Sequence, residues 1–293
     1  ILLTVNAQDW NIPKVGDDGS LVEQAFTLNK KRRNTLLISE ASAYTVALVS
    51  LNQLWYADYP KSSFHFINDN EEWLQMDKMG HMSASYYTGV AGIKAYEWAG
   101  FSRKNAIWYG GMTGSIFLTV IEVLDGTSEQ WGASSGDLIA NTTGSLLAIG
   151  QALKWNEQRI QLKYSYSPSN MAAKNPEQLG SNHLERALKD YNGQTYWLTL
   201  NLKSLLQIEN PDFPSWLSLA LGYGADEMVN PYHEEGDAER YRQFLMSFDV
   251  DLNKIKTKNK TLNSVLHTFG FLKFPTPAIQ YRNGNIFFHP IYY

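Results

Sequence analysis

The sequence predicts an α+β protein, with a mainly helical first part folded as a helical bundle and a smaller second part with a few antiparallel strands. Before residue 165, long segments carry apolar residues at helical spacing, between capping residues and glycines. After it, shorter segments alternate apolar and polar residues, as half-buried strands do. We therefore place a helical domain at residues 34–164 and an α+β extension at residues 165–293.

Four helices are expected in the first domain, and the third is rich in glycine, which lets helices approach closely. Ser102 and Ser135 are the expected N-caps of the third and fourth helices. The first helix is long enough to cross a bilayer, but Glu40 interrupts it, so we expect it to be buried or to lie in one leaflet. The predicted helices are residues 34–56, 72–98, 105–124 and 135–161.

The extension is expected to combine a short helix with strands and a terminal hairpin. The hairpin turn is placed at residues 282–285, because Asn283-Gly284 favours a tight turn. A closed outer-membrane barrel needs at least about eight strands, and the sequence offers fewer candidates. The predicted elements are a helix at 183–191, strands at 195–200, 217–222 and 240–252, and a hairpin within 279–293.

The first residues have the character of the end of a secretory signal peptide. Residues 1–7 combine an apolar run with Val5-x-Ala7, and Gln8 would then begin the mature chain. Residues 8–33 are polar and are expected to form a loop. The pattern predicts a location outside the cytoplasm, and the alternative is an N-terminal strand that happens to end in alanine.

Composition narrows the classes of function. The net charge of −4 is small, so it favours neither nucleic acid nor an anionic lipid surface, and we expect no nucleic acid partner. The printed chain has no cysteine, which excludes disulfides, thiol catalysis and cysteine-ligated metals within it. With 9 Trp, 17 Tyr and 13 Phe, it is rich in side chains that suit large buried surfaces or a membrane–water boundary.

Polar residues recur at the ends of the apolar helices. Asp77 and His81 are four residues apart and share a helix face, and another helix repeats this spacing. Glu122 lies between apolar pairs, where a carboxylate is costly unless it has a partner such as His81 or Lys78. We predict one buried polar cluster made of Asp77, Lys78, His81, Glu122, Asp125, Asp137 and Asn141.

The cluster has two interpretations. It can fix the packing of the helices, with His81 as an ordinary core histidine and Asp137 placed to favour the helix dipole. It can also perform acid–base chemistry, with His81 transferring the proton and Glu122 or Asp77 orienting it. These groups would also suit a hard metal ion, but the sequence holds no established metal motif, and we predict no metal and no cofactor.

A spaced pattern of residues runs through positions 77–144. It consists of Asp77-Lys78-x-x-His81, Ser83, Ser85, Tyr96, Gly100-Phe101-Ser102-Arg103, Glu122-x-x-Asp125, Trp131-Gly132 and Asp137-Leu138-x-x-Asn141-x-x-Gly144. The pattern resembles the YfiM-like proteins, an uncharacterised group in the envelope of Gram-negative bacteria, and more distantly the VanZ-like membrane proteins. The long C-terminal extension is similar to the form found in Bacteroidota, of which the PorD group is associated with the type 9 secretion apparatus.

The resemblance implies a non-enzymatic subunit or assembly factor of an envelope protein-export complex, in its most specific form the type 9 secretion translocon. The expected location is the periplasmic face of the outer membrane, with the helical bundle leaning on the inner leaflet or partly embedded in it. The expected partners are outer-membrane export proteins and outer-membrane lipid. The alternative is an envelope enzyme that acts on lipid or cell-wall polymer through His81 with Glu122 or Asp77.

Overall fold

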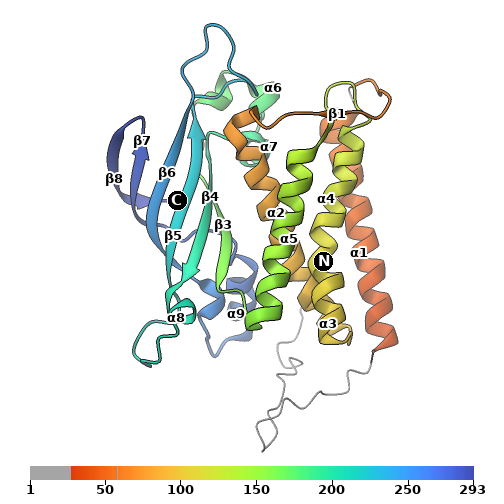
Figure 1. Ribbon diagram of the computed structural model, residues 1–293, viewed down its shortest axis with the longest axis vertical. Helices are drawn as coiled ribbons and strands as arrows, with labels where there is room; N and C mark the ends of the chain where they lie inside the picture. The colour runs from red at the N-terminus through yellow and green to blue at the C-terminus, as the bar shows by residue number, and fades with distance from the viewer. Residues whose placement is uncertain (1–27, 58) are drawn as a thin grey trace, which may run out of the picture.

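The computed structural model describes residues 28–57 and 59–293. The predicted signal remnant, residues 1–7, lies outside the described residues. The same is true of the predicted loop at residues 8–33 up to residue 27. Figure 1 shows two parts side by side, a group of long helices and a twisted antiparallel sheet. The predicted α+β fold is confirmed.

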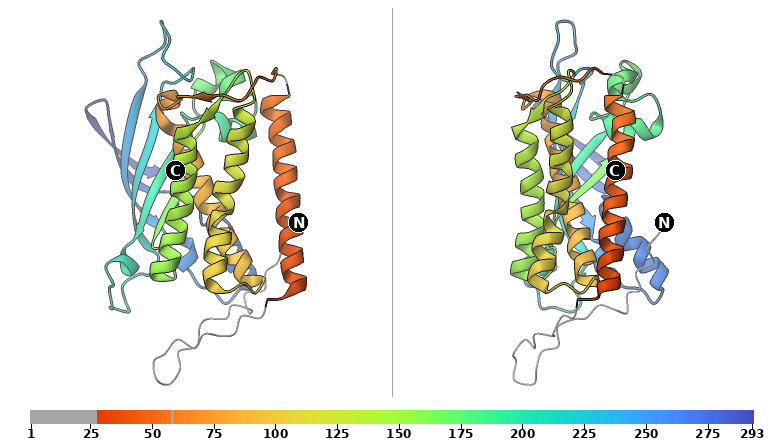
Figure 2. Two further views of the ribbon diagram at one scale, coloured as in Figure 1. Left: turned by 45° about the vertical axis from the view of Figure 1, so that its right-hand side comes forward. Right: turned by 90° about the vertical axis from the view of Figure 1, so that its right-hand side faces the viewer.

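Three helices, α2, α4 and α5, pack against one another at the centre of the helical part. The helix α1 lies on the outside of this group (Figure 2), where Tyr44 stacks on Phe117 of α4 with ring centroids 4.6 Å apart. The segments are α1 (Lys30–Leu51), η2 (Asn52–Tyr56), β1 (Phe66–Ile67), η3 (Glu72–Gln75), α2 (Met76–Trp98), α3 (Arg103–Asn105), η4 (Ala106–Gly110), α4 (Gly111–Asp125), β2 (Ala133–Ser134) and α5 (Ser135–Trp155).

The helix α1 lies at the surface, so the first predicted alternative, a buried helix, is wrong, and the second, a helix in one leaflet, stays a prediction. None of its residues, all of which are described, is buried, and Ile38 is 67% exposed. A polar contact attaches it to the bundle, because Glu40 accepts a hydrogen bond from Tyr96 of α2 at 3.2 Å, and within α1 it accepts another from Tyr44 at 3.1 Å. The charge that interrupts the apolar pattern is therefore a point of attachment to the rest of the bundle.

Glycine sets the spacing between α2 and α5. A Cβ atom at Gly144 would lie 2.1 Å from the carbonyl oxygen of Met82, so only glycine fits there without moving the helices apart. Tyr86, Ile93 and Ile149 pack into the core beside this contact. The close approach of these two helices brings the polar residues at their ends within hydrogen-bonding distance.

The start of α2 is shifted from the predicted residue 72 to Met76. Trp73, Leu74 and Gln75 have φ angles of 47°, 50° and 66°, so they form a left-handed turn that costs about 1–3 kcal/mol for each residue. Contacts with the sheet part hold this turn, since the hydroxyl of Tyr223 donates to the carbonyl of Leu74. The sheet part thus fixes the direction in which α2 begins.

The end of α5 and the first strand differ from the prediction. The helix ends at Trp155 instead of residue 161, and residues 160–166 form the strand β3, which we did not predict. The helix ends because the next residue, Asn156, has a left-handed backbone with φ 58°. The side chain of Gln151 then holds the start of the strand, because its Nε2 donates to the carbonyl of Ile160 and its Oε1 accepts from the N–H of Ile160, both at 2.8 Å. The sheet therefore begins before the domain boundary predicted at residue 165.

Six strands form one antiparallel sheet in which each strand pairs with the next in the chain. The predicted strands and the terminal hairpin are confirmed. The strands are β3 (Ile160–Tyr166), β4 (Gln194–Asn201), β5 (Leu217–Asp226), β6 (Tyr241–Val250), β7 (Thr276–Arg282) and β8 (Asn285–Tyr292). The connecting helices are η5 (Met171–Ala173), α6 (Pro176–Leu179), α7 (His183–Lys189), α8 (Leu202–Leu205), η6 (Leu252–Lys254) and α9 (Lys260–Thr268).

One face of the sheet is buried although it carries polar side chains. Lys163 and Asp249 form an ion pair at 2.5 Å, and neither side chain is exposed. The sheet curls over this face, because Tyr292 of β8 reaches Trp197 of β4, with ring centroids 5.7 Å apart. The polar interior is thus enclosed by the sheet itself.

The opposite face of the sheet is apolar and largely exposed. At β3 and β4 it packs on α2, where Tyr164 and Tyr196 join a core with Met76. Towards β8 the side chains of this face are exposed, and a row of directly paired residues crosses five strands. This row, between 37% and 67% exposed, consists of Leu198, Leu221, Met246, Ile279 and Phe288.

One described helical stretch, Arg103–Asp125, is long and apolar enough to cross a membrane. This assignment rests on the length and composition of the helix alone, and core helices of proteins outside membranes share both properties. The stretch packs against α2 and α5 within the bundle. Partial embedding of the bundle in the inner leaflet therefore stays a prediction.

Candidate functional site

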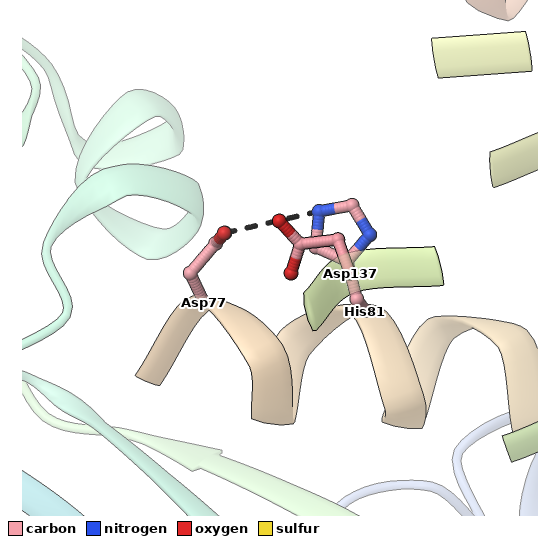
Figure 3. A group of neighbouring side chains, drawn as sticks. All are labelled: Asp77, His81 and Asp137. Atoms are coloured by element: carbon pink, nitrogen blue, oxygen red, sulfur yellow. Dashed lines mark ion pairs between the residues drawn. The ribbon is translucent and has the colours of Figure 1, made fainter. Parts of the chain in front are cut away.

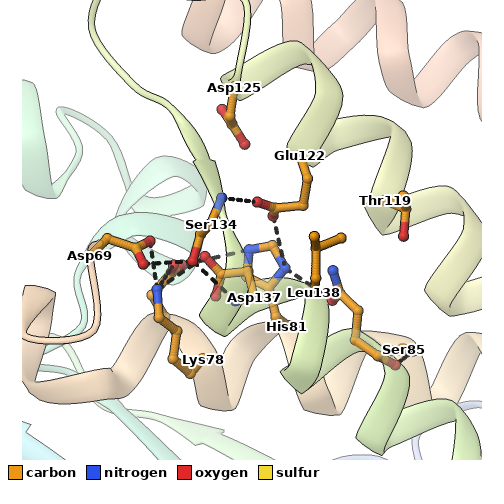
Figure 4. Close-up of polar contacts among 12 residues, drawn as sticks. Asp69, Lys78, His81, Ser85, Thr119, Glu122, Asp125, Ser134, Asp137 and Leu138 are labelled. Carbon is orange, nitrogen blue, oxygen red and sulfur yellow. Dashed lines mark hydrogen bonds and ion pairs between the residues drawn. The ribbon is translucent and has the colours of Figure 1, made fainter. Parts of the chain in front are cut away.

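The predicted polar residues come from three helices whose ends meet beside β1 and β2 (Figure 4). The helix starts and ends lie in one layer, so side chains distant in the sequence become neighbours. The contributors are Asp77, Lys78 and His81 at the start of α2, Glu122 and Asp125 at the end of α4, and Asp137 and Asn141 at the start of α5.

Lys78 is the central cation of the cluster. Its Nζ lies 2.6 Å from Asp69, 3.0 Å from Asp137 and 3.6 Å from Asp77, and its side chain is 12% exposed. Burial alone would lower the pKa of this ammonium, but the charges of Asp77 and Asp137 outweigh it and raise the pKa of Lys78. Lys78 therefore stays charged and ties α2 to α5 and to the loop before α2.

His81 lies between carboxylates and an amide. Its Nδ1 is hydrogen-bonded to Oδ1 of Asn141 at 3.0 Å and lies 3.8 Å from Glu122, while its Nε2 lies 3.9 Å from Asp77. Burial opposes the charged ring, but Asp77, Asp137 and Glu122 together raise the pKa of His81. The surroundings favour an imidazolium that donates to Asn141.

Glu122 is buried, with 2% of its surface exposed. Its Oε2 accepts a hydrogen bond from the backbone N–H of Ser134 at 2.9 Å, and desolvation raises the pKa of the Glu122 carboxyl. Ser134 also caps α5 in place of the predicted Ser135, since its Oγ accepts from the N–H of Asp137 at 3.1 Å and donates to Asp69 at 2.5 Å. Ser134 thereby links the end of α4 to the start of α5.

Asp125 lies at the edge of the cluster, on the far side of Glu122 from Lys78 (Figure 4). Its Oδ1 accepts a hydrogen bond from the hydroxyl of Tyr56 at 2.6 Å. Burial, and then the charge of Glu122, raise the pKa of Asp125 to about 7. Asp125 therefore attaches η2 to α4 and is separate from the central ion pairs.

Several residues of the network escaped the sequence analysis. Asp69 has the sequence context of a helix cap, Ser134 lies in a two-residue strand, and Tyr191 comes from the sheet part and donates to Asp77 at 2.7 Å. Ser85 was part of the spaced pattern but was not assigned to the cluster, although it lies one helical turn after His81, and its hydroxyl donates to a backbone carbonyl of α5 at 2.5 Å. Helical spacing identifies only neighbours on the same helix, so it does not find residues that another segment brings to the cluster.

The negative charge at the centre of the cluster is only partly compensated. Burial, and then the charge of Asp77, raise the pKa of Asp137 to about 8. Oδ1 of Asp137 and Nδ2 of Asn141 are buried without a hydrogen-bond partner among the described residues. Such groups are costly, so the close packing of α2 and α5 must hold them in place.

Asp77, His81 and Asp137 offer ligand atoms that lie within 4.8 Å of one another (Figure 3). The ammonium of Lys78 already lies 3.0 Å from Asp137 and 3.6 Å from Asp77, where a cation would be attracted. Structural metal sites usually use four or more donors. The arrangement therefore fits an ion-pair network better than a closed metal shell.

Chemically, the cluster offers an imidazole between carboxylates, an arrangement that can transfer a proton. A reaction also needs room for a substrate. One cavity of about 330 Å³ is lined by residues that include Gln75 and Arg242, and another of about 210 Å³ lies at Met246 on the apolar sheet face. Neither of these two cavities is lined by a residue of the cluster.

Comparison with known proteins places the same region in an envelope context. Residues 64–151 match a family described as "Predicted periplasmic lipoprotein (DUF2279)". The match covers the polar cluster and spans α2, α4 and most of α5, less than a third of the chain. The description supports the predicted envelope location at the periplasmic face of the outer membrane. Searches of curated proteins and of solved structures gave no match.

Proposed function

We propose that this protein is a non-enzymatic subunit or assembly factor of a protein-export complex at the periplasmic face of the outer membrane. The observation that carries the proposal is the exposed apolar face of the sheet on β4 to β8, called the apolar face below. The buried polar cluster then serves to hold the helices that support the sheet.

The apolar face is continuous over several strands. Beside the row that ends at Phe288 runs a second row of directly paired side chains, Phe244, Tyr281 and Ile286, which are also exposed. The hollow of about 210 Å³ at Met246 lies on the same face and would receive a partner's side chain. Contiguous exposed apolar surface of this kind is typical of interaction sites.

The edge of the sheet favours a protein partner over lipid. In the described part of the chain β8 pairs only with β7, so its outer backbone groups are free to pair with another strand. Inside a lipid phase these groups would stay unsatisfied, at a cost of several kcal/mol each. A partner that supplies a strand satisfies them and covers the apolar face at the same time.

The most specific form of the proposal is the type 9 secretion translocon. It rests on the resemblance carried by residues 77–144 together with the long C-terminal extension. The family description of residues 64–151 names an envelope location and no secretion system. An outer-membrane protein with β-strands would fit the open edge of β8.

The test is affinity purification of a tagged copy from detergent-solubilised envelopes, followed by mass spectrometry. We expect outer-membrane export proteins in stoichiometric amounts, and at least a tenfold loss of them with Met246→Gln/Ile279→Gln on the apolar face. The control Leu184→Gln/Leu188→Gln changes two exposed leucines of α7 in the same way and should keep the partners. Capture of the parent without partners, or partners retained by the sheet variant, would overturn the proposal.

The enzyme alternative rests on His81, which is partly exposed between Glu122 and Asp77. If His81 transferred a proton, His81→Gln would abolish function in cells without changing the captured partners or the stability. Under the proposal, His81→Gln keeps both the partners and the function, because the ring only contributes to packing. Complementation of a deletion strain with His81→Gln separates the two.

A further inference from the structure

We infer that the end of the molecule opposite the polar cluster binds the surface of an anionic phospholipid bilayer. This end, called the basic end below, is formed by the start of α1, α3, the end of α5 and α9, which lie together at the bottom of Figure 1. The inference goes beyond the proposed function, because it concerns a different surface and a different class of partner.

Positive side chains from several segments meet at the basic end. The backbone N–H of Asn29, which caps α1, donates to the carbonyl of Ala99 after α2, and Arg103 of α3 donates to the carbonyl of Ala152 in α5 at 3.4 Å. These contacts hold the segments side by side. The exposed lysines of this end are Lys30, Lys31 and Lys104 on these segments, and Lys256, Lys258 and Lys260 before and at the start of α9, which lies at the same end in Figure 1.

The opposite end of the molecule is acidic. The loop between β5 and β6, at the top of Figure 1, carries the exposed residues Glu234, Glu235 and Glu239. An anionic surface therefore attracts the basic end and repels the acidic end. This difference orients the molecule on the surface although its net charge is −4.

The helix α9 adds an apolar anchor to the charge. Leu262, Val265 and the C-cap Phe269 follow the spacing of one helical stripe, and all are 43% to 49% exposed. None of the described residues of α9 is buried, and the helix is attached to η6 through a hydrogen bond of 2.8 Å between His267 and Asn253. Lys256, Lys258 and Lys260 come just before this stripe, and lysines beside an exposed apolar helix face are typical of segments that lie in the membrane interface.

Aromatic rings at the same end suit the headgroup layer. The guanidinium of Arg32 lies 5.4 Å from the ring centre of Trp98, and the ammonium of Lys154 lies 4.9 Å from that of Trp155. Tryptophan beside lysine and arginine is common where proteins meet the headgroups. A second copy fits this end less well, because two basic ends would repel each other.

The test is flotation of the purified full-length chain with vesicles of phosphatidylcholine alone and with vesicles of phosphatidylcholine and phosphatidylglycerol in equal amounts. We expect binding to the anionic vesicles only, weakening as salt is added. Each lysine near an anionic surface contributes about fivefold to binding, so Lys258→Gln/Lys260→Gln should weaken it about twenty-five-fold. The control Lys61→Gln/Lys174→Gln makes the same change in net charge near the acidic end and should change binding less than about twofold.

Absence of binding to the anionic vesicles at low salt would overturn the inference. Equal losses in the two lysine pairs would also overturn it, because net charge and not the basic end would then govern binding. Dissociation of an oligomer of the parent by Lys258→Gln/Lys260→Gln would overturn the inference as well, because the basic end would then bind a second copy. Partner capture by the apolar face is measured in detergent without vesicles, so the proposed function and this inference fail separately.

Discussion

Lys78 is the residue on which the polar cluster most depends, because three carboxylates surround its ammonium. Lys78→Met leaves the buried carboxylate of Asp69 without its cation and should lower the free energy of unfolding by about 3 kcal/mol. Urea denaturation at neutral pH measures this loss. The exposed Lys61, changed to Met in the same way, should stay within about 0.5 kcal/mol of the parent. Equal losses in the two variants would contradict the central role of Lys78.

Asp125 should make the stability depend on pH. Its pKa is about 7 in the folded protein, and the unfolded value of an aspartate is about 3.9. Between these values the unfolded chain has lost the proton and the folded protein has kept it, so the free energy of unfolding falls as the pH rises.

Asp125→Asn lacks this titration and should therefore gain about 4 kcal/mol relative to the parent between about pH 4 and about pH 7. Denaturation curves of both proteins across this range measure the difference. A difference that stays constant with pH would show that Asp125 does not keep its proton in the folded protein.

The membership of the polar cluster could be predicted from the sequence in part. The four-residue spacing of Asp77 and His81 and the apolar context of Glu122 pointed to residues that do lie together. Asp69 and Tyr191 were not predictable in this way, because a loop and the sheet part bring them to the site. The structure places these side chains together, and their chemical role stays a prediction.

The contact between α2 and α5 gives a test at the scale of elements. Alanine at Gly144 would place a methyl group 2.1 Å from the carbonyl of Met82, so the helices must separate, at a cost of about 3 kcal/mol. Gly150 lies on the same helix with nothing within 4 Å of its added Cβ, and alanine there should stabilise by about 0.5–1 kcal/mol. Thermal unfolding of the two variants measures both effects, and the reverse order would contradict the close packing.

Apolar periodicity located the long helices, because each helix has enough turns for the pattern to repeat. It did not show that α1 is exposed, since composition does not tell whether another element covers an apolar stripe. It missed β3 because the helical pattern continues past Asn156, whose left-handed backbone ends α5, and because the partner of the strand, β4, is distant in the sequence. Boundaries set by such tertiary contacts carry no periodic signal.

The alternation of residues located the strands without showing which face is buried. Two faces with different polarity give the same alternation whichever of them points inward. Here the polar face is inside, where Lys163 and Asp249 form an ion pair at 2.5 Å. The apolar face, on which the proposed function rests, could therefore be found only from the structure.

At the scale of the whole molecule, the proposed surfaces are compatible with one another. The long strands run roughly along the same direction as the long helices, and the basic end lies at one end of both (Figure 1). A molecule that stands with its basic end on the inner leaflet would present the apolar face sideways. A neighbouring outer-membrane protein that projects into the periplasm could then cover this face.

The most direct measurement is site-specific photo-crosslinking in living cells, with a photoreactive amino acid in place of Ile279 or Phe288 on the apolar face. The matched control position is Leu188 on α7, which is also an exposed apolar residue. We predict a crosslink from Ile279 and Phe288 to an outer-membrane protein, and none from Leu188. Absence of a crosslink from the apolar face, or the same product from Leu188, would contradict the proposal that this face binds a partner.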